Sequence, residues 1–249
     1  MTLPSLLIVP GAWHKPDHFR RLVDELSGID VHTVTLTSSG DDPAALRDMY
    51  TDAEVIAQAA AAIDGPVVVV AHSYGGVPAT QALSDAKNVE RIIYLAAMQL
   101  DAGDSCLSPA GGVLMPWAKR HRRDGIGDYL EATTPTTTFY NDVDAATAQR
   151  AAAQVCYQSY ASFEQRLTEV AWRTIPSTYI ICEADNAIPV AAQEQMARRA
   201  DDVHRLTASH SPFLSQPAAV TRLIRLSLGG DIGLPQNGVL QESRERKKQ

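Results

Sequence analysis

The feature that most constrains the fold is the run Val67-Val68-Val69-Val70, in which four β-branched residues follow one another without a polar interruption. β-branched side chains pack well on extended backbone, and a strand that is apolar at every position is buried on both of its faces. Such strands are typical of parallel sheets that helices cover on both sides. The run therefore predicts a parallel strand in the interior of an α/β fold.

Further segments of strand length alternate with segments of helical periodicity. The other predicted strands are Ser5–Val9, Val31–Leu36, Ile92–Leu95, Tyr179–Cys182 and, as an edge strand interrupted by polar residues, Val203–Leu206. The predicted helices are one that follows the capping-box pattern Thr51-x-x-Glu54 and ends at Gly65, then Gly76–Ala86, Val190–Ala200 and Pro217–Leu226. This alternation predicts a doubly wound, mostly parallel sheet of about six strands with right-handed crossovers.

Residues 100–173 break the alternation. They contain no run typical of a parallel strand, only polar turns and helical pieces such as Ala145–Val155. Because the segment is too long for an ordinary loop, we expect a helical cap inserted into a single domain of residues 1–230. Residues 231–249 lack periodicity and are expected to form a disordered tail.

The balance of charge narrows the classes of partner. The chain of 249 residues carries a formal net charge of −7 at pH 7, whereas nucleic acids and anionic membranes require a concentrated basic face. No stretch approaches the ~18 apolar residues of a membrane span, and the amino terminus lacks the basic region of a signal peptide. We therefore expect a cytoplasmic protein with neither nucleic acid nor membrane as partner.

The cysteines give no sign of a disulfide framework or a metal site. Cys106, Cys156 and Cys182 are odd in number and form no C-x-x-C pair, which fits reduced, buried thiols. None has a metal-ligand neighbour at suitable spacing. The sequence therefore indicates neither a metal nor a cofactor.

Residues able to carry chemistry follow the valine strand directly. Ala71-His72-Ser73-Tyr74-Gly75-Gly76 lies between that strand and a predicted helix, in the small-x-Ser-x-Gly pattern of a nucleophile elbow. The strand-to-helix turn is so tight that the residues two before and two after the serine must be small, and Ala71 and Gly75 meet this requirement. Ser73 is therefore the candidate nucleophile, at the positive amino-terminal end of a helix.

A hydroxyl nucleophile needs a base, and the chain has seven histidines. His210 follows the last predicted strand, in a run without periodicity that is expected at the carboxyl edge of the sheet, where catalytic groups gather in open α/β folds. His72 precedes the serine inside the elbow, so its side chain should point away from that of Ser73. His121 lies in a basic run that is expected to be solvated. His210 is therefore the candidate base.

The base in turn needs an acidic partner that orients its second ring nitrogen. The strand Tyr179–Cys182 runs into Glu183-Ala184-Asp185, and spacing alone does not choose between the two carboxylates. We favour Asp185 because it lies further into the loop, with Glu183 as the alternative. The order Ser73, Asp185, His210 is the Ser…Asp…His order of α/β-hydrolases.

Backbone donors for a developing oxyanion are expected beside the elbow. The first strand ends in Val9-Pro10-Gly11-Ala12-Trp13-His14, a turn that this topology places next to Ser73. The amides of Ala12 and Tyr74 are the expected pair, because Pro10 has no N–H and Gly11 lets the chain bend closely.

Together the motifs V-P-G-A-W-H, A-H-S-Y-G-G, E-A-D-N-A-I-P and S-H-S-P-F resemble the α/β-hydrolase superfamily. They are most similar to its small branch of plant methylesterases, hydroxynitrile lyases and bacterial salicylate-esterase-like proteins, and the likeness covers about residues 5–228. The resemblance implies a helical cap over residues 100–173. The family's usual His-Gly at the oxyanion turn is Pro10-Gly11 here, which removes one side chain and leaves the backbone donors.

The resemblance also distinguishes two chemistries. Hydroxynitrile lyases of this branch carry Thr in place of Gly11 and Lys in place of Ser211, so ester hydrolysis is favoured over cyanohydrin cleavage. We expect a serine hydrolase that cleaves a small-molecule carboxylic ester through an acyl-enzyme. A lyase or cyclisation-type tailoring enzyme and a non-hydrolytic ligand-binding protein are the alternatives.

Several apolar and aromatic residues are expected to line a substrate pocket between the sheet and the cap. They are Trp13, His14, Met98, Trp117, Phe139 and Tyr140. The sequence leaves the substrate and the oligomeric state open, a homodimer included.

Overall fold

The computed structural model describes residues 3–228, and the predicted tail of residues 231–249 lies outside this range. A six-stranded sheet in the order β10-β9-β5-β4-β1-β2 forms the centre of the molecule, and every neighbouring pair in it is parallel. Its strands are β1 Ser5–Val9, β2 Val31–Thr33, β4 Val67–His72, β5 Val89–Leu95, β9 Ser177–Cys182 and β10 Asp202–Leu206. The predicted six-stranded parallel sheet is confirmed, with β10 at its edge as expected.

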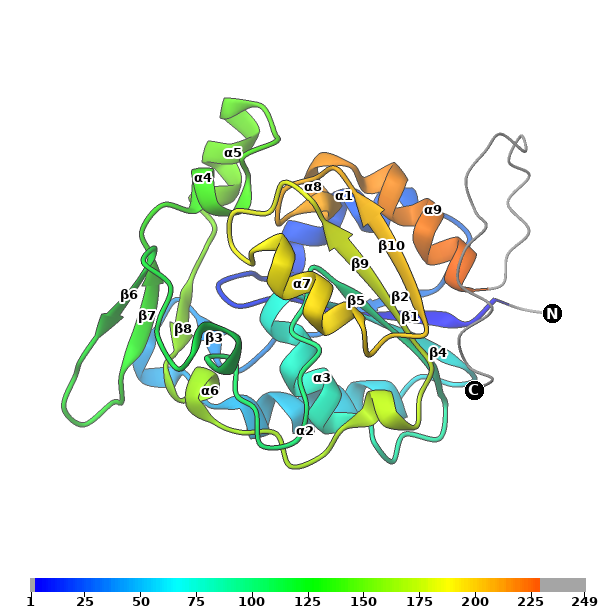
Figure 1. The fold of residues 1–249 in the computed structure, drawn as a ribbon, viewed down its shortest axis with the longest axis horizontal. Coiled ribbons are helices and arrows are strands. Elements are labelled where there is room, and N and C mark those ends of the chain that lie inside the picture. Colours follow the sequence, from blue (N-terminus) through cyan, green and yellow to red (C-terminus); the bar gives the residue numbers. More distant parts are fainter. Residues whose placement is uncertain (1–2, 229–249) are drawn as a thin grey trace.

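Helices cover both faces of this sheet. They are α1 Arg20–Glu25, α2 Met49–Ala61, α3 Gly76–Ala82, α7 Val190–Ala197, α8 Pro212–Ser215 and α9 Pro217–Ser227. Figure 1 shows α1 packed beside α9 on one side of the sheet and α2 beside α3 on the other. The central strands β4 and β9 are buried at every position, as continuous apolar runs between two helical layers require.

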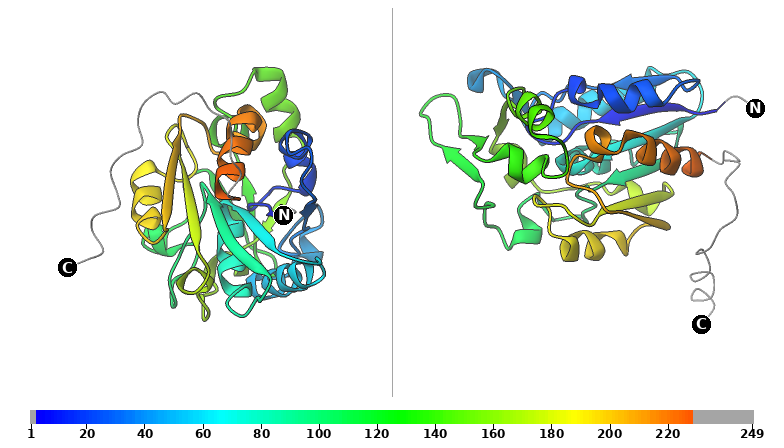
Figure 2. Two further views of the ribbon diagram at one scale, coloured as in Figure 1. Left: turned by 90° about the vertical axis from the view of Figure 1, so that its right-hand side faces the viewer. Right: turned by 90° about the horizontal axis from the view of Figure 1, so that it is seen from above.

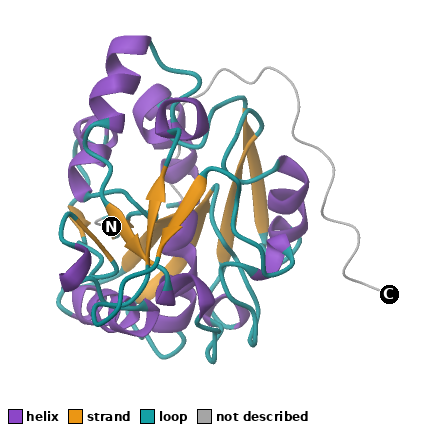
Figure 3. Cartoon of the chain, turned by 90° about the vertical axis from the view of Figure 1, so that its left-hand side faces the viewer, coloured by secondary structure: helices purple, strands orange, loops and turns teal. Residues whose placement is uncertain are grey.

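Most of residues 100–173, the cap segment, lies beyond the carboxyl ends of the parallel strands, and its last residues run back to the amino end of β9 (Figures 1 and 2). This segment holds helices α4 Pro135–Phe139, α5 Ala145–Ala152 and α6 Ala161–Glu164. It also holds strands β6 Ala118–His121, β7 Tyr129–Ala132 and β8 Tyr157–Ser159, which join β3 Ser39–Gly40 in an antiparallel sheet. Figure 3, viewed from this side, shows helices and strands together there. The sequence reasoning missed these strands because each has only three or four residues, too few for a clear alternation.

Three predicted helices end three or four residues too late, since α2, α3 and α7 end at Ala61, Ala82 and Ala197. Two further predictions were wrong for a reason that the hydrogen bonds show. Helix α2 begins at Met49 rather than after a Thr51 capping box, because the Asp48 side chain caps it by accepting from the Thr51 amide at 2.9 Å. Strand β2 ends at Thr33 rather than Leu36, because the chain then turns to place the amides of Thr37 and Ser38 on the Asp52 carboxylate.

The remaining helical turns are short 3₁₀ segments. They are Pro16–Phe19, Pro43–Ala45, Ser73–Gly75, Ser108–Ala110 and Ala171–Arg173. Within residues 3–228, no helix has the length and hydropathy to cross a membrane.

Candidate active site

Ser73 sits at the sharp turn that connects β4 to α3. Its backbone has φ = 53°, a left-handed conformation that costs a residue other than glycine about 1–3 kcal/mol. The surrounding chain is packed too closely for a side chain at Gly75, where a Cβ would lie 2.4 Å from the Pro10 carbonyl oxygen. The elbow geometry expected from the sequence is therefore present, and it leaves Ser73 partly exposed above buried neighbours.

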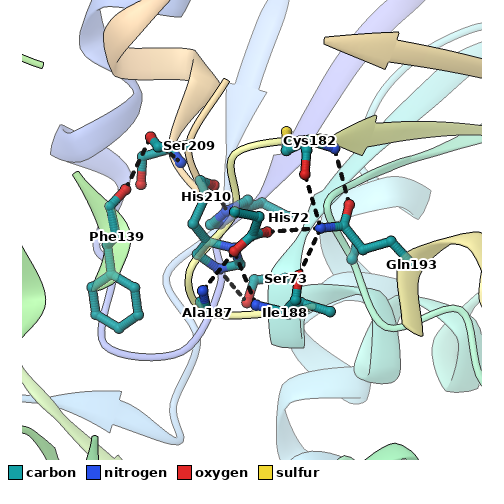
Figure 4. A network of polar contacts seen from close by, with 12 residues as sticks. His72, Ser73, Phe139, Cys182, Ala187, Ile188, Gln193, Ser209 and His210 are labelled. Carbon is teal, nitrogen blue, oxygen red and sulfur yellow. Dashed lines mark hydrogen bonds and ion pairs between the residues drawn. The ribbon is translucent and has the colours of Figure 1, made fainter. Parts of the chain in front are cut away.

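His210 and Asp185 complete a chain of hydrogen bonds that begins at Ser73. The Nε2 atom of His210 lies 2.9 Å from the Ser73 Oγ, and its Nδ1 lies 2.8 Å from the Asp185 Oδ2. Figure 4 shows His210 and Ser73 side by side, although they are 137 residues apart in the chain. An Nδ1–H that donates to the carboxylate leaves Nε2 free to accept the serine proton.

The loops that carry these residues follow adjacent strands. Asp185 lies between β9 and α7, and His210 lies between β10 and α8. Because both strands are parallel to β4, their carboxyl ends meet at the edge of the sheet where the elbow also lies. His210 is only 2% exposed, which protects its hydrogen bonds from competition with water.

Asp185 accepts four hydrogen bonds. Its Oδ1 accepts from the amides of Ala187 at 2.7 Å and Ile188 at 2.9 Å, while its Oδ2 accepts from His210 and from the Gln193 Nε2 at 3.0 Å. These donors hold the carboxylate in one orientation. The Asp185 carboxylate is therefore held in the orientation in which it contacts His210 Nδ1.

The alternative acid, Glu183, is placed elsewhere. It is exposed and binds the Arg205 guanidinium at 2.8 Å and the Thr207 hydroxyl at 3.1 Å. These hydrogen bonds hold the pKa of Glu183 below its ordinary value. The geometry thus places Asp185, and not Glu183, beside the histidine.

His72 is not a base for Ser73. Its Nε2 donates to the backbone carbonyl of His210 at 2.8 Å, so it anchors the loop that carries the candidate base (Figure 4). Burial, reinforced by the neighbouring His210 and His14, holds the pKa of His72 well below the ordinary histidine value. A neutral His72 with its proton on Nε2 suits this anchoring role.

The turn after β1 lies against the elbow. Val9 pairs with Ala71, and a Cβ at Gly11 would lie 2.7 Å from the Ser73 Cβ, so only glycine allows this approach. Among the described residues, neither the Ala12 amide nor the Tyr74 amide donates to another backbone group. Neither amide is therefore taken up by a backbone acceptor in the described chain, as the oxyanion role predicted for them requires.

The sequence that builds this site matches a known protein family. The model described as "Alpha/beta hydrolase family" matches residues 6–223, nearly the whole described chain. The chain belongs to the alpha/beta hydrolase family.

Known relatives agree with this α/β-hydrolase assignment. The chain is 31% identical over 233 residues to "Probable hydrolase R7" of Phoma sp. (strain ATCC 20986 / MF5453), covering 87% of this chain and 95% of that protein. It is 29% identical over 246 residues to "Alpha/beta hydrolase nvfD" of Aspergillus novofumigatus (strain IBT 16806), covering 92% and 98%. A methylesterase of Arabidopsis has a similar solved structure, with a TM-score of 0.78, 18% identity and coverage of 91% and 99%. The protein is thus an α/β-hydrolase that shares its fold with this methylesterase.

In this α/β-hydrolase the predicted pocket residues gather near the triad. The Phe139 ring centre lies 5.7 Å from that of His210, and Trp117 and Trp13 pack against Phe139 at 5.2 and 5.9 Å. Met98 is tied to the elbow because its amide donates to the Ser73 carbonyl at 3.0 Å. Trp117 is partly exposed, whereas the other residues of the set are buried.

His14 and Tyr140 form hydrogen bonds that reach the backbone of the turn after β1. His14 donates from Nδ1 to the Ala12 carbonyl at 2.8 Å and accepts the Tyr140 hydroxyl proton at Nε2, at 2.9 Å. His14 therefore links the Ala12 carbonyl to Tyr140 of the cap segment. Both side chains are almost fully buried, which favours a structural contribution to the turn after β1.

Gln193 is a site residue that the sequence reasoning missed. It is fully buried on α7, and besides Asp185 it binds both the amide and the carbonyl of Cys182, at 3.0 and 3.3 Å. Its only sequence signal is a glutamine at helical spacing with Met196 and Ala197 on the buried face of α7. A buried amide side chain on such a face needs several polar partners.

Proposed function

We propose that this hydrolase is a serine esterase that cleaves a small-molecule carboxylic ester through an acyl-enzyme. The observation that carries the proposal is the continuous chain from the Ser73 Oγ through His210 to Asp185, with links of 2.9 and 2.8 Å. A hydroxyl, an imidazole and a carboxylate in this order form a nucleophile, a base and an orienting group.

Acylation begins with attack of the Ser73 Oγ on the ester carbonyl carbon while His210 Nε2 takes the hydroxyl proton. The tetrahedral intermediate then breaks its bond to the alkoxy oxygen, which leaves as an alcohol with the proton from Nε2. Water attacks the acyl-Ser73 ester in the same way and gives up a proton to His210. The carboxylic acid departs, and the proton returns to Ser73.

The oxyanion of each tetrahedral intermediate would be held by the Ala12 and Tyr74 amides. Support for this role comes from the position of the β1 turn against Ser73 and from the absence of other backbone acceptors for these amides in the described part of the chain. Donors arranged before the reaction can contribute about 10²–10³ in rate each.

The walls around the triad favour an apolar acyl or alkyl group. The ring that the cap segment places beside His210 is Phe139, against which Trp117 packs. Aromatic surface of this kind binds apolar groups rather than charged ones. We infer a neutral ester with an apolar or aromatic group as the substrate class.

Two positions support hydrolysis over cyanohydrin cleavage. Ser211, which follows the candidate base, is fully buried and carries no positive charge to stabilise cyanide. Gly11 has no space for the threonine side chain of the lyases unless Ser73 moves, because its Cβ would lie 2.7 Å from the Ser73 Cβ.

The test combines turnover with covalent labelling. A panel of p-nitrophenyl esters should be hydrolysed, and a fluorophosphonate should attach to Ser73 as mapped by mass spectrometry. A ligand-binding protein without turnover would instead be stabilised by esters that it leaves intact.

A further inference from the structure

A buried polar network begins at the side chain of Tyr74, the residue that follows Ser73 in the elbow. The Tyr74 hydroxyl donates to the Asp52 Oδ2 at 2.9 Å, and Asp52, on α2, is fully buried. The same carboxylate accepts from the amide and hydroxyl of Thr37, at 2.7 and 2.9 Å, from the Ser38 amide at 2.9 Å and from the Ser38 hydroxyl. Five donors thus compensate the burial of this charge.

Gln158 of β8 extends the network to the cap segment. Its Nε2 donates to the Ser38 Oγ at 2.8 Å and to the Ser162 Oγ at 2.7 Å. Its Oε1 accepts from the Trp13 amide at 3.4 Å and from the Ser39 hydroxyl at 2.5 Å. Gln158 is fully buried, so its amide group depends on protein partners for its hydrogen bonds.

The two ends of the network are the two segments that carry the proposed oxyanion donors. At one end it binds the side chain of Tyr74, whose own amide is one donor. At the other end it binds the Trp13 amide, in the peptide unit that follows the Ala12 donor. The backbone beside each donor is left-handed, with φ = 53° at Ser73 and φ = 63° at Trp13. Such conformations persist only when surrounding groups hold them.

We propose that Asp52 and Gln158 are positioning residues that set the separation of the Tyr74 and Ala12 amides by acting as one connected unit through Ser38. This inference rests on the proposed esterase function and extends it to residues that contact neither Ser73, His210 nor Asp185 in the described hydrogen bonds. The network joins three parts of the chain, namely Asp52 on α2, Ser38 in the loop after β2, and Gln158 on β8. Because β8 belongs to the cap segment, the cap segment takes part in arranging the oxyanion site.

A network that only stabilises the fold would lower the melting temperature of its variants and leave turnover per folded molecule unchanged. If the network positions the oxyanion donors, variants that disrupt it have a lower kcat with little change in KM, because the lost interaction forms in the transition state. Members of one unit also show non-additive effects. Kinetic separation and non-additivity therefore distinguish positioning from stability.

The experiment compares Tyr74→Phe, Gln158→Met and the double variant in hydrolysis of p-nitrophenyl butyrate, with rates normalised to the serine titrated by a fluorophosphonate. Tyr74→Phe removes one oxygen and keeps the Tyr74 amide. We expect each single variant to lose roughly 10- to 100-fold in kcat with KM within about threefold. The double variant should lose no more than about threefold beyond the worse single variant.

Tyr94→Phe is the matched control. Its hydroxyl is also fully buried and bonds to a neighbouring hydroxyl, Thr80 Oγ1 at 2.8 Å, but it lies outside the network. We expect a comparable drop in melting temperature with kcat within about twofold of the wild type. Should Gln158→Met not fold, Ser38→Ala cuts the network at its centre and takes its place.

The possible outcomes distinguish failure of the positioning role from failure of the proposed esterase function. Wild-type kcat in Tyr74→Phe and Gln158→Met, or strictly multiplicative losses in the double variant, would overturn the inference while leaving the esterase proposal standing. A wild-type chain that neither hydrolyses esters nor reacts with the fluorophosphonate overturns both.

Discussion

The Gln193 side chain donates from Nε2 to the Asp185 Oδ2 at 3.0 Å, the same oxygen that lies 2.8 Å from His210 Nδ1. Gln193 therefore shares an acceptor with the candidate base and limits the positions that the carboxylate can take. Its Oε1 is held by the Cys182 amide at 3.0 Å, at the end of β9. The acid is thus tied to the sheet through one glutamine.

Substituting Gln193→Met should lower kcat about tenfold, because Asp185 then keeps only three of its hydrogen bonds and orients His210 less well. The free energy of unfolding should fall by about 1–3 kcal/mol as buried groups lose partners. Gln99→Met is the matched control, since Gln99 is also fully buried and its Nε2 binds Ser177, away from the triad. Equal kcat values for the two variants would contradict a positioning role for Gln193.

The two carboxylates that the sequence left open can be separated by charge-neutral substitutions. Asp185→Asn should reduce kcat by about 10³–10⁴, because an amide cannot hold the histidine in the required tautomer. Glu183→Gln should stay within twofold of wild type, since this side chain is exposed and bound to Arg205. Steady-state kinetics on one ester measures both, and a larger loss in Glu183→Gln would reverse the assignment of the acid.

The sequence predicted the sheet, the tight turn at Ser73 and the juxtaposition of Ser73, His210 and Asp185 because these depend on local signals. A buried valine run, small residues around a serine, and polar residues just after strands are each visible within a few positions. Asp52, Gln158 and Gln193 gave no comparable signal. Their roles arise from contacts such as Gln158 to Ser38 across 120 positions, which only the folded chain brings together.

The cap segment shows the same limit. Strand β7, Tyr129–Ala132, is buried only at alternate positions, and its partners β6 and β8 are equally short. Four alternating residues cannot be told from a turn, so their pairing had to come from the structure. The helix Ala145–Ala152, by contrast, has a capping aspartate and an amphipathic pattern, and it was predicted.

Close packing at the elbow makes a specific stability prediction. In Gly75→Ala the added Cβ would lie 2.4 Å from the Pro10 carbonyl oxygen and 2.9 Å from that of Val9, so backbone must shift. We expect a loss of about 2 kcal/mol in the free energy of unfolding, together with a large loss of activity. In Gly40→Ala the nearest atom is the end of the flexible Leu46 side chain at 3.3 Å, and the loss should be within about 0.5 kcal/mol. Denaturant unfolding compares the two, and an unaffected Gly75→Ala would refute the close approach.

The buried histidines make stability depend on pH. Burial is the main reason that the pKa values of His14 and His72 lie well below the ordinary value of about 6.5, and burial also lowers the pKa of His18. As the pH falls below about 6.5 the unfolded chain binds protons that the folded chain does not, so the free energy of unfolding decreases. Burial raises the pKa of Asp52, which by itself would increase the free energy of unfolding as the pH falls. We expect the three histidines together to outweigh this single carboxyl group.

The melting temperature should therefore fall as the pH is lowered from 7 to 5. Differential scanning fluorimetry across this range measures the slope, and His72→Gln should make it shallower. A melting temperature that stays constant or rises between pH 7 and 5 would show that the histidines take up protons without cost in the folded state.

The most direct test of the central claim is the reaction of Ser73 itself. The wild-type chain should react with a fluorophosphonate at Ser73, as mapped by mass spectrometry, and should hydrolyse a short p-nitrophenyl ester. Ser73→Ala should lose both labelling and at least about 10³-fold of the turnover, while its melting temperature stays close to that of the wild type. Full ester hydrolysis by Ser73→Ala, or labelling at a residue other than Ser73, would contradict the assignment.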